Sequence, residues 1–273
     1  MSDRITLTLR APLTHPLDAD AIAPDRLAAL DAHEISTLRL WDGRNAVALG
    51  DVFTVIGDRS SNVQLEGDLA RLHGVGTLMS AGTLEISGSI GHSLGVRMRG
   101  GAISVSGSAG DDAGAAMAGG SIAVAGNAGD RAGGALQGAS KGMTGGEIVV
   151  RGGVGREAGA RMRRGILYCA SSGVGTGIGM IAGNIIVSGA IGDSVGAGNK
   201  RGTIVALGPV RVPRAYAYAC TYRPPHLSLM LLSLRARFGL PVDDAHVHGL
   251  FKRYSGDLAE IGKGEILEWQ ATH

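Results

Sequence analysis

The chain has 273 residues with a formal net charge of +2, and 46 of them are glycine while only 8 are proline. A collagen triple helix is excluded because the glycines follow no Gly-X-Y period, and intrinsic disorder is excluded because 44% of the residues are hydrophobic. A net charge so close to zero also argues against general binding to nucleic acid or to an anionic membrane.

The N-terminal flank, residues 1–50, is predicted to be a cap. It holds an alternating strand at Ile5–Leu9, a short helical stretch at Pro24–Ala32 and a second strand at Ile35–Trp41. Two irregular early rungs are expected next, at Val52–Ile56 and Val63–Leu65. A cap is needed because a stack of strands with open ends exposes unpaired backbone groups.

Residues 51–208 carry an internal repeat of glycine, methionine and short β-branched segments. The glycines that precede these segments lie 19 residues apart at most steps, at positions 82, 101, 120, 146, 165, 183 and 202. Each copy contains a short alternating strand, such as Ile103–Val105 or Ile122–Val124, and no run long enough for a helix. A fixed period means one unit stacked on copies of itself. The repeat therefore predicts an all-β fold, a right-handed parallel β-helix with about 19 residues per rung.

Six of the eight methionines lie three residues before a repeat glycine, namely Met79, Met98, Met117, Met143, Met162 and Met180. If the rungs stack, these side chains form one internal column that ends at Asn199. A soft-metal or binding stripe is the functional alternative. Core packing is the favoured interpretation, because methionine adapts to irregular interior gaps.

One step of the repeat is 26 residues long, from Gly120 to Gly146, so seven residues are inserted within Gly133–Lys141. Insertions in stacked repeats form loops on one face, often a face that binds partners. A plain surface bulge and a partner contact both remain open.

Residues 209–273 are predicted to form the C-terminal cap. An amphipathic helix begins near Pro225 and carries apolar residues at helical spacing, up to Phe238. Gly239 and Pro241 end it. A terminal strand is expected at Gly264–Trp269. The apolar face of the helix is expected to cover either the last rung or a partner.

A reducing, cytoplasmic location is expected, because Cys169 and Cys220 are too few for a disulfide framework. Residues 1–10 contain no apolar core of a signal peptide. The most apolar run, Leu227–Leu234, is much shorter than the ~20 residues that span a bilayer. No membrane contact is predicted.

No set of residues predicts a catalytic, cofactor or metal site in this chain. The repeat accounts for the Gly173–Gly179 pattern, which lacks the following helix of a dinucleotide site. His246 and His248 would share a face on a strand, but ordinary loop histidines are favoured. Cys169 is expected to be a buried thiol, and Asp257 has no evident partner.

The Gly/Met repeat resembles two related groups, the C-terminal domain of glutamate synthase large subunits and the C subunit of formylmethanofuran dehydrogenase. The C-terminal flank separates them. Its segments Tyr222–Pro225, Phe238–Val242 and Tyr254–Leu267 look like the ending of the C subunit. This resemblance covers almost the whole chain.

The resemblance implies a non-catalytic structural subunit, with the chemistry on other subunits. The expected partners are an amidohydrolase-like hydrolase subunit, a formyltransferase subunit and a dehydrogenase-like B subunit. A methanofuran-type carrier and metal ions are expected on those partners, and no cofactor on this chain.

Two settings exist in that family. In methylotrophic bacteria, a formyltransferase/hydrolase complex converts formyl-tetrahydromethanopterin via formylmethanofuran to formate during formaldehyde oxidation. In methanogens, a tungsten or molybdenum enzyme reduces CO2. The chain has only four lysines among its 26 basic residues, a bias typical of GC-rich bacteria, which favours the first setting.

Two further hypotheses compete with the structural subunit. The chain could be a free-standing relative of the glutamate synthase domain, or an enzyme with its own site near His246, His248 and Asp257.

Overall fold

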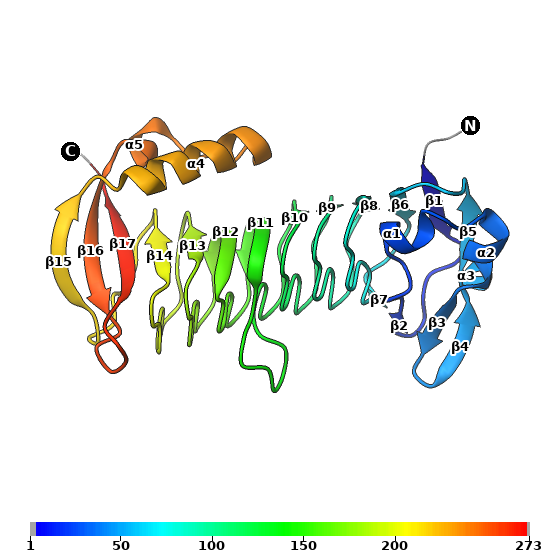
Figure 1. The fold of residues 1–273 in the computed structure, drawn as a ribbon, viewed down its shortest axis with the longest axis horizontal. Helices are drawn as coiled ribbons and strands as arrows, with labels where there is room; N and C mark the ends of the chain where they lie inside the picture. The colour runs from blue at the N-terminus through cyan, green and yellow to red at the C-terminus, as the bar shows by residue number, and fades with distance from the viewer. Residues whose placement is uncertain (1–3, 272–273) are drawn as a thin grey trace.

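The computed structural model describes residues 4–271, and these are mostly strands with few helices (Figure 1). The N-terminal elements are β1 (Ile5–Leu9), β2 (Leu17–Asp18), α1 (Pro24–Leu27), α2 (Ala32–Thr37), β3 (Arg39–Asp42), β4 (Asn45–Ala48), α3 (Leu49–Val52) and β5 (Phe53–Ile56). The central strands are β6 (Asn62–Glu66), β7 (Leu72–His73), β8 (Thr83–Ser87), β9 (Ala102–Val105), β10 (Ser121–Val124), β11 (Thr144–Val154), β12 (Arg164–Ser172), β13 (Asn184–Val187) and β14 (Thr203–Ala206). The C-terminal elements are β15 (Ala217–Tyr222), α4 (Pro225–Phe238), α5 (Asp244–Val247), β16 (Leu250–Gly256) and β17 (Gly264–Gln270).

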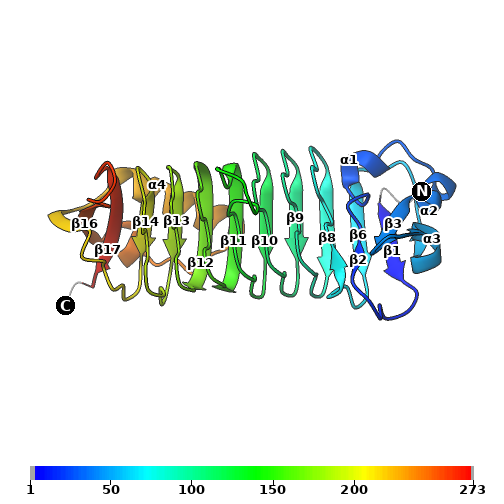
Figure 2. The same ribbon diagram turned by 90° about the horizontal axis from the view of Figure 1, so that it is seen from below.

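The main sheet has 13 strands in the order β15-β16-β17-β14-β13-β12-β11-β10-β9-β8-β6-β1-β5. From β1 through β6 to β14 and on to β17, every neighbouring pair is parallel. The register holds from turn to turn, so that Ile103 pairs with Ile122 and Ile122 with Ile148. A second row of parallel bridges links Leu69, Ile90, Ala109, Ala128 and Val154. Successive turns of the chain therefore lie directly over one another along the length of the molecule (Figure 2).

The methionine column is confirmed as an interior feature, because all six side chains have no solvent exposure. Each one reaches the repeat glycine of the next turn. A Cβ added to Gly120 would lie 2.7 Å from Met98 Cε, and one added to Gly146 would lie 2.7 Å from Met117 Cε. Gly120 and Gly146 also have φ +84° and +86°, and each added Cβ would lie 2.7 or 2.8 Å from the carbonyl oxygen of the preceding repeat glycine. The backbone therefore requires glycine at these positions, and the methionine contact adds to that requirement.

A ladder of side chains runs beside the strands and caps the backbone of each following turn. His73 Nδ1 accepts from the backbone N–H of His92 at 2.8 Å, and His92 Nδ1 accepts from Asp111 N–H at 2.9 Å. The ladder continues from Asp111 Oδ1 to Asp130 N–H at 2.8 Å. Each Nδ1 accepts a hydrogen bond from a backbone N–H and therefore carries no hydrogen of its own in this arrangement.

The N-terminal flank corrects three sequence predictions. The helical stretch at Pro24–Ala32 ends at Leu27, and a second helix, α2, covers the first residues of the predicted strand Ile35–Trp41. Helix α2 begins there because of a capping box: Asp31 accepts from Glu34 N–H at 2.8 Å, and Glu34 accepts from Asp31 N–H at 2.9 Å. The segment Val52–Ile56 is not a rung, because β5 pairs antiparallel with β1 at the edge of the sheet.

The C-terminal flank contains the predicted helix and terminal strand. Helix α4 packs along the side of the coil rather than over the last rung (Figure 1). Its buried residues Leu227, Leu231 and Leu234 share an apolar cluster with outward-facing strand residues, among them Tyr168 and Ile186. The outer face of β11–β14 is apolar there because this helix covers it. At the end of the helix, Gly239 adopts a left-handed conformation with φ +59°.

Within residues 4–271, no helix combines the length and apolar character needed to cross a bilayer.

Candidate functional site

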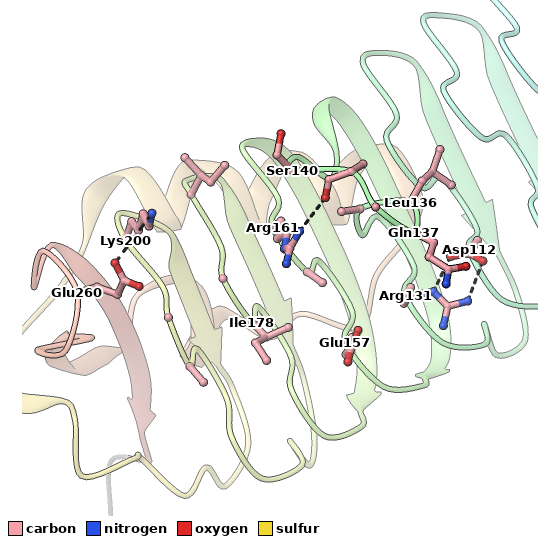
Figure 3. Close-up of a pocket in the computed structure, with 18 residues that line it drawn as sticks. Asp112, Arg131, Leu136, Gln137, Ser140, Glu157, Arg161, Ile178, Lys200 and Glu260 are labelled. Carbon is pink, nitrogen blue, oxygen red and sulfur yellow. Dashed lines mark hydrogen bonds and ion pairs between the residues drawn. The ribbon is translucent and has the colours of Figure 1, made fainter.

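A groove of about 1110 Å³ lies beside the inserted loop (Figure 3). The inserted loop, residues 135–140, forms one end, and Glu260 in the β16–β17 turn forms the other. Both segments project from the same side of the coil (Figure 1). The floor consists of turns that precede β12, β13 and β14.

One column of the coil, four residues before most repeat glycines, varies along the molecule. Its residues are Leu78, Arg97, Ala116 and Arg161 in earlier turns and Gly179 and Gly198 in the last two, all with positive φ. The two glycines add no side chains to the floor of the groove, on which Ile178 is 37% exposed.

The inserted loop is fixed to the next turn of the coil. Arg161 Nη1 donates to Ala139 O at 2.8 Å. The loop backbone donates as well, from Ala135 N–H to Ala160 O at 3.0 Å and from Gly142 N–H to Arg161 O at 2.9 Å. The sequence predicted a loop in Gly133–Lys141, and the structure gives that loop a defined place as one wall of the groove (Figure 3).

Asp257 holds the other end of the groove together. Its Oδ2 accepts from Gly198 N–H at 3.0 Å, and its Oδ1 accepts from Ala259 N–H at 2.9 Å. Asn199, which ends the methionine column as predicted, is buried and bonds both backbone groups of Gly202 at 2.9 and 2.7 Å. No partner of Asp257 was evident in the sequence. In the structure its carboxylate accepts from the backbone N–H groups of Gly198 and Ala259, so it holds the β16–β17 turn against the turn that precedes β14.

Charged side chains of both signs line the groove. Arg131, Arg161 and Lys200 are the basic ones, and Asp112, Glu157 and Glu260 are the acidic ones. Lys200 Nζ lies 4.0 Å from the Glu260 carboxylate. On the other side, Arg131 and Asp112 neutralise each other through two hydrogen bonds of 2.8 Å (Figure 3).

The structure does not bring the sequence-selected polar residues into one site. His246 lies in α5 and not on a strand, because Asp243 caps that short helix, and its ring packs against Trp269 at 4.5 Å. His248 follows the same helix and is exposed. Asp257 lies beyond β16, whose seven residues separate it from the histidines by about 20 Å.

The remaining candidate for chemistry is a thiol. Cys169 has no solvent exposure, and burial raises its pKa to about 12. It is therefore protonated at neutral pH and unsuited to nucleophilic attack. Among residues 4–271, no three His, Cys, Asp or Glu side chains are grouped so that they could hold a metal ion.

Sequence reasoning missed the groove, because it joins segments from about residue 112 to residue 260. A signal was present in the repeat, where a seven-residue insertion is followed by glycine at positions 179 and 198.

No protein-family model matches the chain. A chain in the crystal structure of the formyltransferase/hydrolase complex (FhcABCD) from Methylorubrum extorquens, in complex with methylofuran, is similar with a TM-score of 0.90 and 38% identity. That match covers 97% of this chain and 100% of the other.

Two curated relatives match over shorter stretches. The C subunit of the formyltransferase/hydrolase complex Fhc of Methylorubrum extorquens is 38% identical over 86 residues, 32% of either chain. The C subunit of the molybdenum-containing formylmethanofuran dehydrogenase 1 of Methanosarcina barkeri is 39% identical over 80 residues, 28% of this chain and 27% of that protein. These two alignments span about a third or less of the curated relatives.

Proposed function

Because the chain belongs to the family of C subunits of formylmethanofuran dehydrogenases and formyltransferase/hydrolase complexes, we propose that it is a structural subunit of a formyltransferase/hydrolase complex. The observation that carries the proposal is the match over the full length of a chain in the FhcABCD crystal structure. The proposed reaction of the whole complex is transfer of the formyl group of formyl-tetrahydromethanopterin to a methanofuran-type carrier, followed by hydrolysis to formate. It would serve formaldehyde oxidation in the cytoplasm.

We also infer the finer architecture: a right-handed parallel β-helix of about 19 residues per rung over residues 51–208, between caps at 1–50 and 209–273. The unbroken parallel register and the second row of bridges support it. Such a coil is a rigid rod, since each turn is bonded to the next along its backbone. Rigidity suits a subunit that positions other subunits.

The proposal assigns no active site to this chain. The partners would be an amidohydrolase-like hydrolase subunit, a formyltransferase subunit and a dehydrogenase-like B subunit, which would hold the carrier and any metal ions. The buried thiol of Cys169 and the separation of His246 from Asp257 support this division of labour. The hypothesis of an independent enzyme near His246, His248 and Asp257 finds no support within residues 4–271, because these three side chains do not lie together.

A second setting, as the C subunit of a molybdenum or tungsten formylmethanofuran dehydrogenase, is favoured only by the partial matches to those proteins. The match to the FhcABCD chain over 97% of this chain favours the main proposal over a free-standing relative of the glutamate synthase domain.

Co-expression tests the proposal directly. The chain, carrying an affinity tag, is expressed with formyltransferase and hydrolase subunits from the same genome. We expect all of them to co-purify at fixed stoichiometry, and the complex to release formate from formyl-tetrahydromethanopterin. A chain that purifies without those subunits, or with glutamate synthase subunits instead, would contradict the proposal.

A further inference from the structure

We propose that β15, the free edge strand at the C-terminal end of the main sheet, is extended by an uncharged β-strand of a partner subunit. This inference rests on the proposed function, because it names one contact through which the chain would join its complex. The juxtaposition that carries it is a row of unpaired backbone groups, neutral exposed side chains and a basic residue at each end of the strand.

The backbone of β15 is open on one side. Among the described strands, β15 (Ala217–Tyr222) is the last in the main sheet and pairs with β16 alone (Figure 1). About half of the N–H and C=O groups of such a strand point away from its neighbour. Within residues 4–271, no loop or side chain bonds the backbone of β15 on that outer side, whereas the preceding Ala215 carbonyl accepts from Leu258 N–H at 2.9 Å. The open row is therefore about 20 Å long, at ~3.3 Å per residue.

The other sheet edges are shorter or covered. At the opposite end of the main sheet, β5 has four residues, and α2 and α3 pack against it (Figure 1). In the small sheet, β4 has four residues and directly follows Arg44, and β7 has two. Short strands, charges and covering helices all prevent unwanted pairing at an edge. Strand β15 is longer and has one protective feature, a bulge at Ala219, on both sides of which the pairing with β16 continues.

The side chains of β15 select an uncharged strand. The segment AYACTY contains no charged residue, and five of its six residues are exposed. Tyr218 is 59% exposed, its hydroxyl lies 3.0 Å from Thr221 Oγ1, and its ring lies edge-on to Tyr254 at 6.1 Å. Aromatic and β-branched residues pair favourably across neighbouring strands. A partner strand with such residues would cover this edge, while a charged side chain would meet no opposite charge in β15.

The charges at the two ends of β15 argue against a second copy of this chain as the occupant. Arg214 and Arg223 flank the strand, both are exposed, and neither forms an ion pair with a described residue. In an antiparallel pair of two β15 strands, the start of one strand lies beside the end of the other. Arg214 of one copy would then approach Arg223 of the other at both ends, and like charges there oppose pairing. A strand of a different subunit carries no such penalty.

Hydrogen–deuterium exchange, resolved to single amides, tests the backbone contact in the wild-type chain. In the isolated chain we expect fast exchange at the outward amides of residues 217–222. In the complex assembled with formyltransferase and hydrolase subunits, the same amides should exchange at least tenfold more slowly, because the added strand accepts from them. Unchanged rates at the outward amides would overturn the proposal.

A charge placed in the edge tests whether the contact contributes to assembly. Ala219→Lys introduces a lysine at an exposed position that has no residue directly opposite on β16. Ala46→Lys is the matched control, the same change at an exposed residue of the edge strand β4. By biolayer interferometry against the co-purified remaining subunits, we expect Ala219→Lys to raise the dissociation constant at least tenfold and Ala46→Lys to stay within twofold of wild type. Equal weakening by both variants, or none by Ala219→Lys, would overturn the proposal, and thermal unfolding confirms that each variant is folded.

The oligomeric state of the isolated chain identifies the wrong occupant directly. We expect a monomer in light scattering. A dimer that Ala219→Lys dissociates would show that β15 pairs with itself and would overturn the proposal. If the wild-type chain does not associate with the other subunits at all, the proposed function fails. If it associates and the outward amides of β15 exchange as fast as before, only the edge-strand proposal fails.

Discussion

The contact between Met180 and Gly202 gives a direct test of why the repeat requires glycine. A Cβ added to Gly202 would collide with Met180 Sδ and lie 2.7 Å from its Cγ and 2.8 Å from its Cε. These are its three nearest atoms, and all belong to one side chain. Gly202 also lacks the positive φ of most repeat glycines, so the collision with Met180 is the expected cost of an alanine there.

The magnitudes follow from burial and crowding. Met180 is fully buried, so Met180→Ala should cost about 2–5 kcal/mol of unfolding free energy. Gly202→Ala should cost about 1–3 kcal/mol in the wild-type background, because the core has no spare room. In the Met180→Ala background the obstructing atoms are gone, so the same change should cost close to zero. The coupling between the two sites is then about 1–3 kcal/mol.

Thermal unfolding of the four proteins, followed by circular dichroism, measures this cycle. At ~2–4 °C of Tm per kcal/mol, Gly202→Ala should lower Tm by several degrees alone and by less than about 2 °C when Met180 is already alanine. If Gly202→Ala lowers Tm equally in both backgrounds, the methionine does not dictate the glycine, and the packing argument is wrong.

Three further outcomes are expected. His73 has its pKa lowered below 6.5 by burial and by its stacked histidine neighbour, so the unfolded chain binds more protons. The contribution of neutral His73 to folding stability is fully present above pH 6.5 and is lost as pH falls below that value. Between about pH 7.5 and 5, the Tm of His73→Asn should therefore fall less than the Tm of the wild type. An equal fall in both proteins would contradict the lowered pKa of His73. Cys220 is exposed and Cys169 is buried, so a thiol reagent at about pH 8 should modify one thiol in the native protein and two after denaturation; rapid modification of both in the native protein would contradict the burial. Asp31→Ala removes the cap of α2 and should lower Tm in a thermal shift assay, whereas the control Asp42→Ala should leave Tm unchanged.

The repeat allowed the central strands, the interior methionines and the terminal strand to be predicted from sequence, because a fixed period forces equivalent residues into equivalent environments. The prediction failed where local signals compete. Ile35 alternates as in a strand, yet the Asp31–Glu34 capping box starts a helix there. The segment at Val52–Ile56 has strand composition, but composition does not reveal whether a strand pairs parallel or antiparallel.

The groove could not be predicted because its parts are far apart in sequence. The inserted loop was identified, but its hydrogen bonds from Arg161 depend on the stacking of the next turn. Glu260 approaches Lys200 only because β17 returns to pair with β14. The glycines at positions 179 and 198 are visible in the sequence, but only the structure shows that they lie beside the inserted loop.

The central claim is that this chain supports a complex without performing its chemistry. The most direct measurement compares formate release from the formylated carrier by the isolated chain and by the remaining subunits with this chain added. The account predicts no turnover by the isolated chain at any concentration, and turnover in the presence of the partners. Formate release by the purified chain alone, at a rate that rises in proportion to its concentration, would contradict it.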